Sequence, residues 1–290
     1  MVSRRAAAVV LVVSGSLACL LLRDGHNWGG DFAAYIMQAH SLVEGTTAAF
    51  LDLNTFAARN SDVPMGPDAY PWGYPLILAP LCWLFGFNLW VMKLLNVAFY
   101  VAALWILLQL YASRLEATSS TLLMAVFAFN PYMLAFTDDI LSDIPFLFLA
   151  LSSLWLIDAV LLRRRRLLSP LADGMLLGIL MFLASLVRNE GYLLLPTLLF
   201  AYAARGWMTS PVARVKPGAP AAVDLVPFAV FAVLSVLARW ALPHATASNL
   251  DLLAATSPER VASNLWYYLT LPAHFFWTGP LRTISFAALP

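Results

Sequence analysis

Charged residues are scarce in this chain. Asp, Glu, Lys and Arg make up 11% of its 290 residues and hydrophobic residues 61%, whereas roughly 25% of a typical soluble domain is charged. The mean hydropathy is +0.78. The formal net charge of +1 also lacks the basic excess with which proteins bind nucleic-acid phosphates. The composition therefore predicts an integral membrane protein in contact with membrane lipids, and no nucleic-acid partner.

Cysteine and histidine are also rare. The two cysteines, Cys19 and Cys82, lie far apart in apolar surroundings, which favours buried small side chains over a disulfide framework or a metal site. The four histidines are scattered along the chain. No Asn-x-Ser/Thr acceptor for N-glycosylation occurs, which is compatible with a bacterial source, as is the wealth of alanine and arginine.

Long hydrophobic stretches recur along the chain. A transmembrane helix needs about 20 mostly apolar residues, and seven stretches meet or approach this length: 6–22, 91–111, 119–136, 144–162, 167–187, 191–207 and 225–242. The first follows Arg4 and Arg5 as the core of a signal peptide would, but the many stretches behind it favour a retained signal anchor. The fold class is therefore an all-α integral membrane protein with about seven transmembrane helices.

An eighth apolar stretch, 74–87, decides the topology. As a helix it measures roughly 21 Å, and it contains Pro75 and Pro80, so it is too short to span the membrane comfortably. We predict that it lies along the interface. With a cytoplasmic N-terminus, residues 23–90 then form one large outer loop with two interfacial helices.

The basic residues support this topology, because short cytoplasmic loops are enriched in Lys and Arg. The predicted inner loops contain Arg4, Arg5, Arg114, Arg163, Arg164, Arg165, Arg166, Arg205, Arg214 and Lys216, and most of the acids fall outside. Counting 74–87 as a span would put residues 163–166 on the side opposite the N-terminus. We therefore expect a multi-pass protein of the plasma (inner) membrane whose active face is extracytoplasmic.

Two regions follow from this topology. Residues 1–242 form the transmembrane module, and residues 243–290 form an extracytoplasmic or interfacial segment. The aromatic-rich stretch 263–281 reads as a further interfacial or membrane helix, and its position near the last residue leaves open that the sequence is a piece of a longer protein.

Three groups of polar residues are expected to meet on the outer face. Ionisable side chains are costly at membrane depth, so those at the ends of membrane helices are candidates for a functional site. The first is Asp31 with Tyr35 and Gln38, which share a helical face. The second lies within "TDDILSDIP" and contains Asp138, Asp139 and Asp143; the third is "VRNEG", with Arg188, Asn189 and Glu190. The first loop adds Trp28, Tyr70, Trp72 and Tyr74.

Each group also has a purely structural interpretation. Asp31 is a suitable N-cap for an interfacial helix, and Asp143 for the fourth span, with Pro145 in its first turn. Arg188 can reach lipid headgroups beside an exposed partner, Glu190, and Lys93 can anchor the second span. Convergence of the groups on one face, beside an aromatic loop, favours a functional site.

The order of these pieces resembles the polytopic GT-C glycosyltransferases, which include protein mannosyltransferases and aminoarabinose lipid A transferases. The similar stretches are "GGDFAAYIMQAHSL", "YPWGYPLILAPLCWLFGFN", "NPYMLAFTDDILSDIPFLFLALSSLWL" and "GMLLGILMFLASLVRNEGYLLLP". The resemblance covers essentially residues 6–242, although each motif is loose. It implies inverting transfer of a sugar from a polyprenyl-phosphate donor to a hydroxyl of a glycan, lipid or protein.

The resemblance also implies roles for the polar residues. Asp31 would act as general base, if it comes within about 3 Å of the acceptor hydroxyl, and Asp143 is the second catalytic candidate. Arg188, followed by Lys93, would stabilise the leaving phosphate. The other substrate-binding candidates are Tyr35, Trp72, Tyr74, Asp138, Asp139, Asn189 and Glu190.

Two further questions concern cofactors and protein class. The acids at 31, 138, 139 and 143 suit a divalent cation, but no histidine pair or recognisable ligand spacing accompanies them, so we expect no required metal and leave a cation open. A secondary transporter would carry polar residues near the membrane midplane, whereas here the charges lie at the ends of the spans. A noncatalytic assembly partner with the same scaffold stays an alternative.

Overall fold

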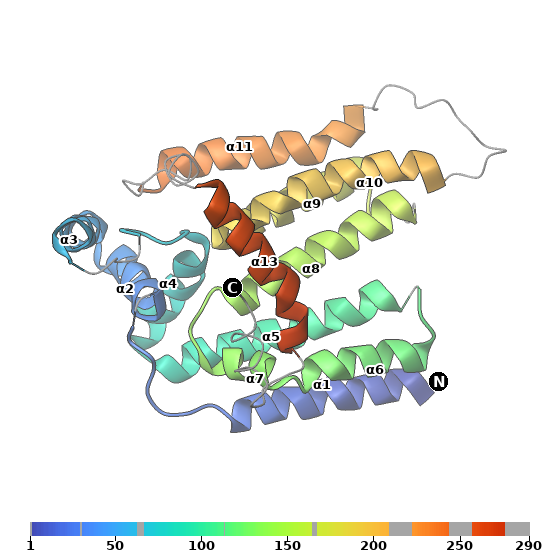
Figure 1. The fold of residues 1–290 in the computed structure, drawn as a ribbon, viewed down its shortest axis with the longest axis horizontal. Helices are drawn as coiled ribbons and strands as arrows, with labels where there is room; N and C mark the ends of the chain where they lie inside the picture. Colours follow the sequence, from blue (N-terminus) through green and yellow to red (C-terminus); the bar gives the residue numbers. More distant parts are fainter. Residues whose placement is uncertain are drawn as a thin grey trace. The chain divides into compact units, whose positions relative to one another are not determined.

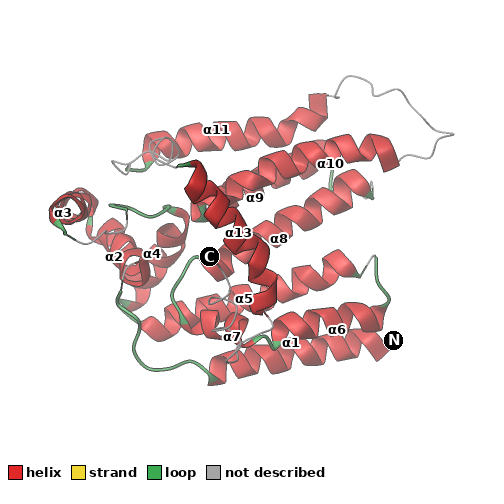
Figure 2. Cartoon of the chain, in the orientation of Figure 1, coloured by secondary structure: helices red, strands yellow, loops and turns green. Residues whose placement is uncertain are grey.

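The computed structural model describes residues 2–29, 31–62, 67–112, 114–163, 167–208, 222–243 and 257–275. Within these residues every regular element is a helix (Figure 2), which confirms the all-α prediction. The chain divides into two units, Met1–Ala245 and Thr246–Pro290. The second unit contains helix α13 (Pro258–Phe275), and all the other helices belong to the first.

Four helices or helix pairs are long and apolar enough to cross a membrane. They are α5 (Leu89–Tyr111), α8 with its π-helical end (Asp143–Leu162), α9 (Pro170–Val187) and α11 with the preceding 3-10 turn (Val223–Ala241). A bent pair, α6 (Ala117–Ala128) and α7 (Pro131–Asp138), would make a fifth. The structure therefore supports a membrane protein with four or five candidate spans rather than the seven predicted from the sequence.

Two of the predicted spans, 6–22 and 191–207, are not in this set. Helix α1 (Val2–Leu20) has 19 residues, and its part Arg5–Leu20 is a shorter apolar helix. Helix α10 (Leu194–Met208) has 15 residues, because a 3-10 helix, Asn189–Leu193, contains the first residues of the predicted stretch. Helix α4 (Gly73–Phe85) has 13 residues and is as short as its sequence suggests, below the roughly 17 residues at which a helix begins to span.

The predicted span 119–136 is broken. Helices α6 and α7 meet at an angle of 53°, because Pro131 has no backbone N–H to continue the ladder of α6. The Asn130 side chain instead accepts hydrogen bonds from the backbone of Tyr132 (2.9 Å) and Met133 (3.2 Å), which starts α7. Asn130-Pro131 therefore marks the start of a new helix within an apolar stretch.

The first unit is built around α8. This helix packs against α5 and α9; α9 in turn packs against α11, and α1 against α5 and α6. One core joins Tyr74, Met92, Leu156, Met181 and Leu198. Figure 1 shows α2 (Asp31–Glu44), α3 (Thr47–Asn60) and α4 gathered at the end of these helices where α1 finishes, away from the N-terminus. These three helices thus cover one end of the bundle.

Three contacts fix this covering layer. The Gln38 amide donates to the Tyr70 carbonyl (2.9 Å) and accepts from the Tyr70 N–H (3.1 Å), which joins α2 to the segment before α4. The Trp72 indole donates to the carbonyl of Pro243 after α11 (2.8 Å). A Cβ on Gly73 would lie 2.5 Å from the Val187 nitrogen, so α4 touches the end of α9 backbone to backbone.

Candidate functional site

The arginine predicted to bind phosphate lies between two acids. Arg188 follows the last residue of α9, and its Nη1 lies 2.7 Å from Asp143 Oδ1 at the start of α8. Its Nη2 lies 3.1 Å from Glu190 Oε1 and its Nε 3.4 Å from Oε2. The three side chains are 28%, 38% and 53% exposed, in the order Arg188, Asp143 and Glu190. We call these three residues the Arg188 cluster.

The neighbouring Arg188 charge determines the ionisation state of the Glu190 carboxyl. Burial alone would raise the pKa of this carboxyl, but the hydrogen bond from Arg188 lowers it, and the net effect is a pKa below the ordinary value. Glu190 therefore stays ionised and paired at neutral pH.

Tyr35 and Asp31 lie beside the cluster on α2. The Tyr35 hydroxyl is 2.8 Å from the Ser142 hydroxyl, and burial raises the pKa of Tyr35 to about 12, with Arg188, Asp31 and Asp143 all close enough to act on it. Asp31 is the first residue of α2 rather than the residue before it. Among the described residues, its carboxylate has no hydrogen-bond or ion-pair partner.

Lys93 and Asp138 lie elsewhere in the fold. Lys93 Nζ donates to Asp138 Oδ1 (2.7 Å) and to the carbonyls of Arg23 and Gly25 (2.8 Å each). Asp138 Oδ2 also accepts from Arg23 Nε, and Oδ1 from the Arg23 backbone N–H (2.9 Å each). An ammonium has three protons, so all the donors of Lys93 are used within the protein. The pair joins α5 and α7 to the segment that follows α1.

Asp139 comes next in the chain and differs from Asp138. Burial and the adjacent Asp138 charge raise the pKa of Asp139. His26 lies near it, and burial lowers the pKa of this histidine. His26 Nε2 lies 3.2 Å from the Phe32 carbonyl and therefore donates, whereas its buried Nδ1 has no hydrogen-bond partner among the residues that the structure describes. His26 was not among the predicted site residues, because its position depends on a turn that no periodic pattern predicts.

The other predicted substrate-binding residues are divided between core and surface. Trp72 is buried, with its N–H on Pro243. Tyr74 is fully buried and donates to Asn96 Oδ1 (2.9 Å), and Asn96 donates to the Asp139 carbonyl. Asn189 is exposed next to Arg188. Of the predicted set, the structure thus brings together Asp31, Tyr35, Asp143, Arg188 and Glu190, with Asn189 alongside.

Ser142 is the residue of this site that the sequence reasoning missed. It is fully buried, precedes α8 and meets Tyr35 across a large sequence separation. The signal was present as a small polar residue within "DDILSDIP", but only the pairing of α2 with the start of α8 reveals its partner.

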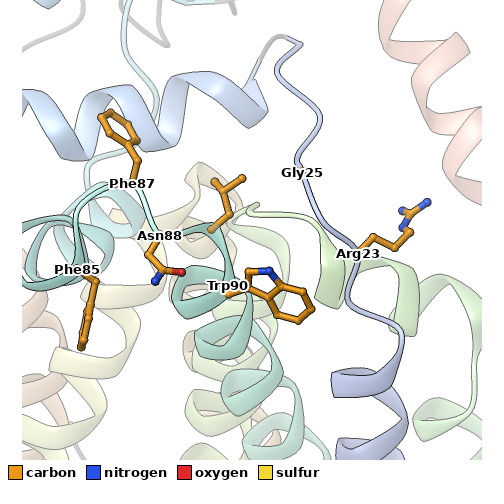
Figure 3. Close-up of a pocket in the computed structure, with 7 residues that line it drawn as sticks. Arg23, Gly25, Phe85, Phe87, Asn88 and Trp90 are labelled. Carbon is orange, nitrogen blue, oxygen red and sulfur yellow. The ribbon is translucent and has the colours of Figure 1, made fainter.

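A separate pocket lies beside the first loop. It has a volume of about 450 Å³ and is lined by Arg23, Gly25, Phe85, Phe87, Asn88, Leu89 and Trp90. In Figure 3 the Trp90 ring points toward the 23–25 segment, and its N–H donates to Asp24 (3.1 Å). None of these lining residues belongs to the Arg188 cluster.

Cationic side chains engage two of the four acids predicted to suit a divalent cation. Asp138 is engaged by Lys93 and Arg23, and Asp143 by Arg188. Within the described ranges, no three His, Cys, Asp or Glu residues are close enough to hold a metal ion. Binding a divalent cation through Asp138 or Asp143 would require first removing a cationic side chain, so these residues do not fit a resident metal.

Comparisons with protein-family models, with curated proteins and with solved structures find no match to this chain.

Proposed function

We propose that the protein is a GT-C-type membrane glycosyltransferase. It moves a sugar from a polyprenyl-phosphate donor to a hydroxyl of a glycan, lipid or protein, with inversion at the anomeric carbon. In this proposal the chain crosses the plasma membrane of a bacterium seven times with a cytoplasmic N-terminus. The shorter helices α1 and α10 complete the spans, and residues 23–90 form the extracytoplasmic loop over the site.

The observation that carries the proposal is the meeting of Asp31, Tyr35, Asp143 and Arg188 from segments far apart in the sequence. The Asp31 carboxylate, which has no partner among the described residues, thus lies near the ion pair of Asp143 and Arg188 at one end of apolar helices. A transferase with a lipid-phosphate donor needs these two functions, a base for the acceptor and a cation for the phosphate, at the membrane surface.

The chemistry follows from these groups. The acceptor oxygen bonds to the anomeric carbon while the bond from that carbon to the phosphate oxygen breaks, and its electron pair stays on the phosphate. The hydroxyl proton passes to Asp31, whose oxygens no cation engages. Arg188 stabilises the charge that develops on the phosphate, because guanidinium binds phosphate oxygens in a bidentate manner. Tyr35 remains protonated and can donate to a sugar oxygen.

The test is transfer of radiolabelled sugar from polyprenyl-phosphate donors in membranes that contain the wild-type chain, Asp31→Asn or Arg188→Ala at matched folded abundance. Asp52→Asn, on an exposed residue of α3, is the control. We expect both site variants to lose at least about a hundredfold in rate and the control to retain wild-type activity. Full activity of Asp31→Asn would refute the assigned base, and no transfer by the wild type from any donor would favour an assembly partner or a transporter.

A further inference from the structure

The two acids of the Arg188 cluster hold different edges of the guanidinium. Glu190 contacts Nε and Nη2, which together form the side edge, through its two oxygens at 3.4 and 3.1 Å. Asp143 contacts Nη1, one of the two nitrogens of the end edge, through a single oxygen at 2.7 Å. A planar guanidinium presents a pair of parallel N–H groups along each of these edges. The end edge, where Asp143 contacts one nitrogen only, is therefore the edge at which another bidentate anion can replace it.

The position of each acid in the chain also favours Asp143 over Glu190 as the acid that leaves Arg188. Glu190 is two residues from Arg188 in the same tight turn, and Gly191 fixes this turn because a Cβ there would lie 2.3 Å from the Ser185 nitrogen. Asp143 comes from a different helix, α8. Asp143 can therefore leave Arg188 by a side-chain rotation, whereas Glu190 stays within reach of the guanidinium because both residues belong to the same turn.

Repulsion between an incoming phosphate and the carboxylates beside Arg188 favours replacement of one carboxylate by the phosphate. Asp143 and Glu190 contact Arg188, Asp31 lies near Asp143, and Lys93 is fully engaged by other groups. A phosphate brought to this cluster meets repulsion from carboxylates as well as attraction from the guanidinium. Its binding therefore improves when the carboxylate on the end edge leaves.

We infer, on the basis of the proposed function, that the donor phosphate displaces Asp143 from the end edge of Arg188 while Glu190 keeps the guanidinium in place. Asp143 is then an exchange partner whose freed carboxylate accepts hydrogen bonds from hydroxyls of the bound sugar or acceptor. Glu190 is a positioning residue that acts through Arg188 and does not touch the substrate. Donor binding thus precedes the release of Asp143 for its role in transfer.

This inference predicts opposite signs for two similar charge removals. Asp143→Asn removes the competing anion, so binding of a lipid phosphate becomes about threefold to tenfold tighter, although transfer is lost. Glu190→Gln releases the side edge, so the guanidinium becomes mobile and binding weakens by a similar factor. Glu190→Asp, which keeps the charge, restores part of the affinity. Two acids that each held a sugar hydroxyl would both weaken binding when replaced.

The experiment measures binding of farnesyl phosphate to the full chain in nanodiscs of zwitterionic lipid, with farnesol as the probe without phosphate. Wild type, Asp143→Asn, Glu190→Gln, Glu190→Asp and the control Asp52→Asn are compared at equal folded amounts, and transfer is assayed on the same samples. We expect the control to match wild type, which separates a local effect from a change in net charge.

The outcomes distinguish the two proposals. If wild type transfers sugar and binds farnesyl phosphate, but Asp143→Asn binds it no more tightly, the exchange is wrong and the proposed function stands. If Glu190→Gln binds as tightly as wild type, Glu190 does not position the guanidinium. If wild type neither prefers farnesyl phosphate over farnesol nor transfers sugar, the proposed function itself fails.

Discussion

Lys93 Nζ and Asp138 Oδ1 lie 2.7 Å apart in an ion pair whose side chains are only 2% and 7% exposed. The ammonium also holds the carbonyls of Arg23 and Gly25, so it connects the segment after α1 to α5 and α7. A buried pair of this kind contributes little compared with an apolar replacement of both partners, but loss of one partner leaves the other charge uncompensated.

Lys93→Met should therefore destabilise the protein by about 3 kcal/mol. The two carbonyls lose their donor, and Asp138 keeps only Arg23. The measurement is the midpoint of thermal unfolding in detergent, with Arg239→Met on α11 as the control for loss of a cation. A midpoint equal to that of the wild type would show that the pair does not hold this segment.

Gly73→Ala should disturb the Arg188 turn from a distance. The new Cβ would lie 2.5 Å from the Leu186 and Val187 backbone, so α4 or the end of α9 must shift, at a cost of about 1–3 kcal/mol. We expect a lower melting temperature and slower transfer. Gly174→Ala on α9 is the matched control, because its nearest neighbours are Val226 side-chain atoms at 3.2 Å; equal losses in both variants would contradict the close-approach argument.

The Glu190 ion pair should show in the pH dependence of stability. The pKa of Glu190 lies below its ordinary value of 4.5 in the folded protein, so the unfolded chain binds more protons between these two values. The stabilisation is then complete above about pH 4.5 and disappears as the pH falls through the folded-state pKa. Its size is below about 1 kcal/mol, because the side chain is half exposed.

The measurement for Glu190 is the difference in melting temperature between wild type and Glu190→Gln from pH 7 to pH 3. We expect a constant small difference down to about pH 5 and its loss at lower pH. A difference that grew on acidification would mean that Glu190 is destabilised in the folded state.

Asp158→Asn should separate stability from binding. Asp158 is buried at the end of α8 opposite Asp143 and pairs with Arg114 and with Arg163 (2.7 Å). The substitution leaves two partly exposed arginines without their carboxylate and should cost about 1–2 kcal/mol. Folded protein should still bind farnesyl phosphate as wild type does, measured in the same nanodisc assay; weaker binding would argue against an independent site.

The sequence predicted elements better than it predicted side-chain partners. Apolar length and composition were sufficient for α5, α8, α9 and α11, because burial in a membrane demands them along the whole helix. The break between α6 and α7 was not predicted, because the length of the apolar stretch was given more weight than Asn130-Pro131, which is a helix-start signal. The residues of the Arg188 cluster were found because charge at a helix end is conspicuous.

The partners of these residues could not be predicted in the same way. Lys93 and Arg188 looked alike in sequence, as cations near the outer ends of helices. Lys93 meets three acceptors from two distant segments, whereas Arg188 keeps both of its acids partly exposed. Lys93 finds acceptors within the protein because of the path that residues 23–26 take after α1. No periodic pattern in the sequence predicts that path.

The hydrogen bond from Trp72 to Pro243 has a consequence for the order of folding. It joins positions 171 residues apart in the chain, so the segment before α4 completes its contacts only after α11 has been synthesised. Contacts between such distant positions form late, because the entropy of closing the intervening chain must first be overcome.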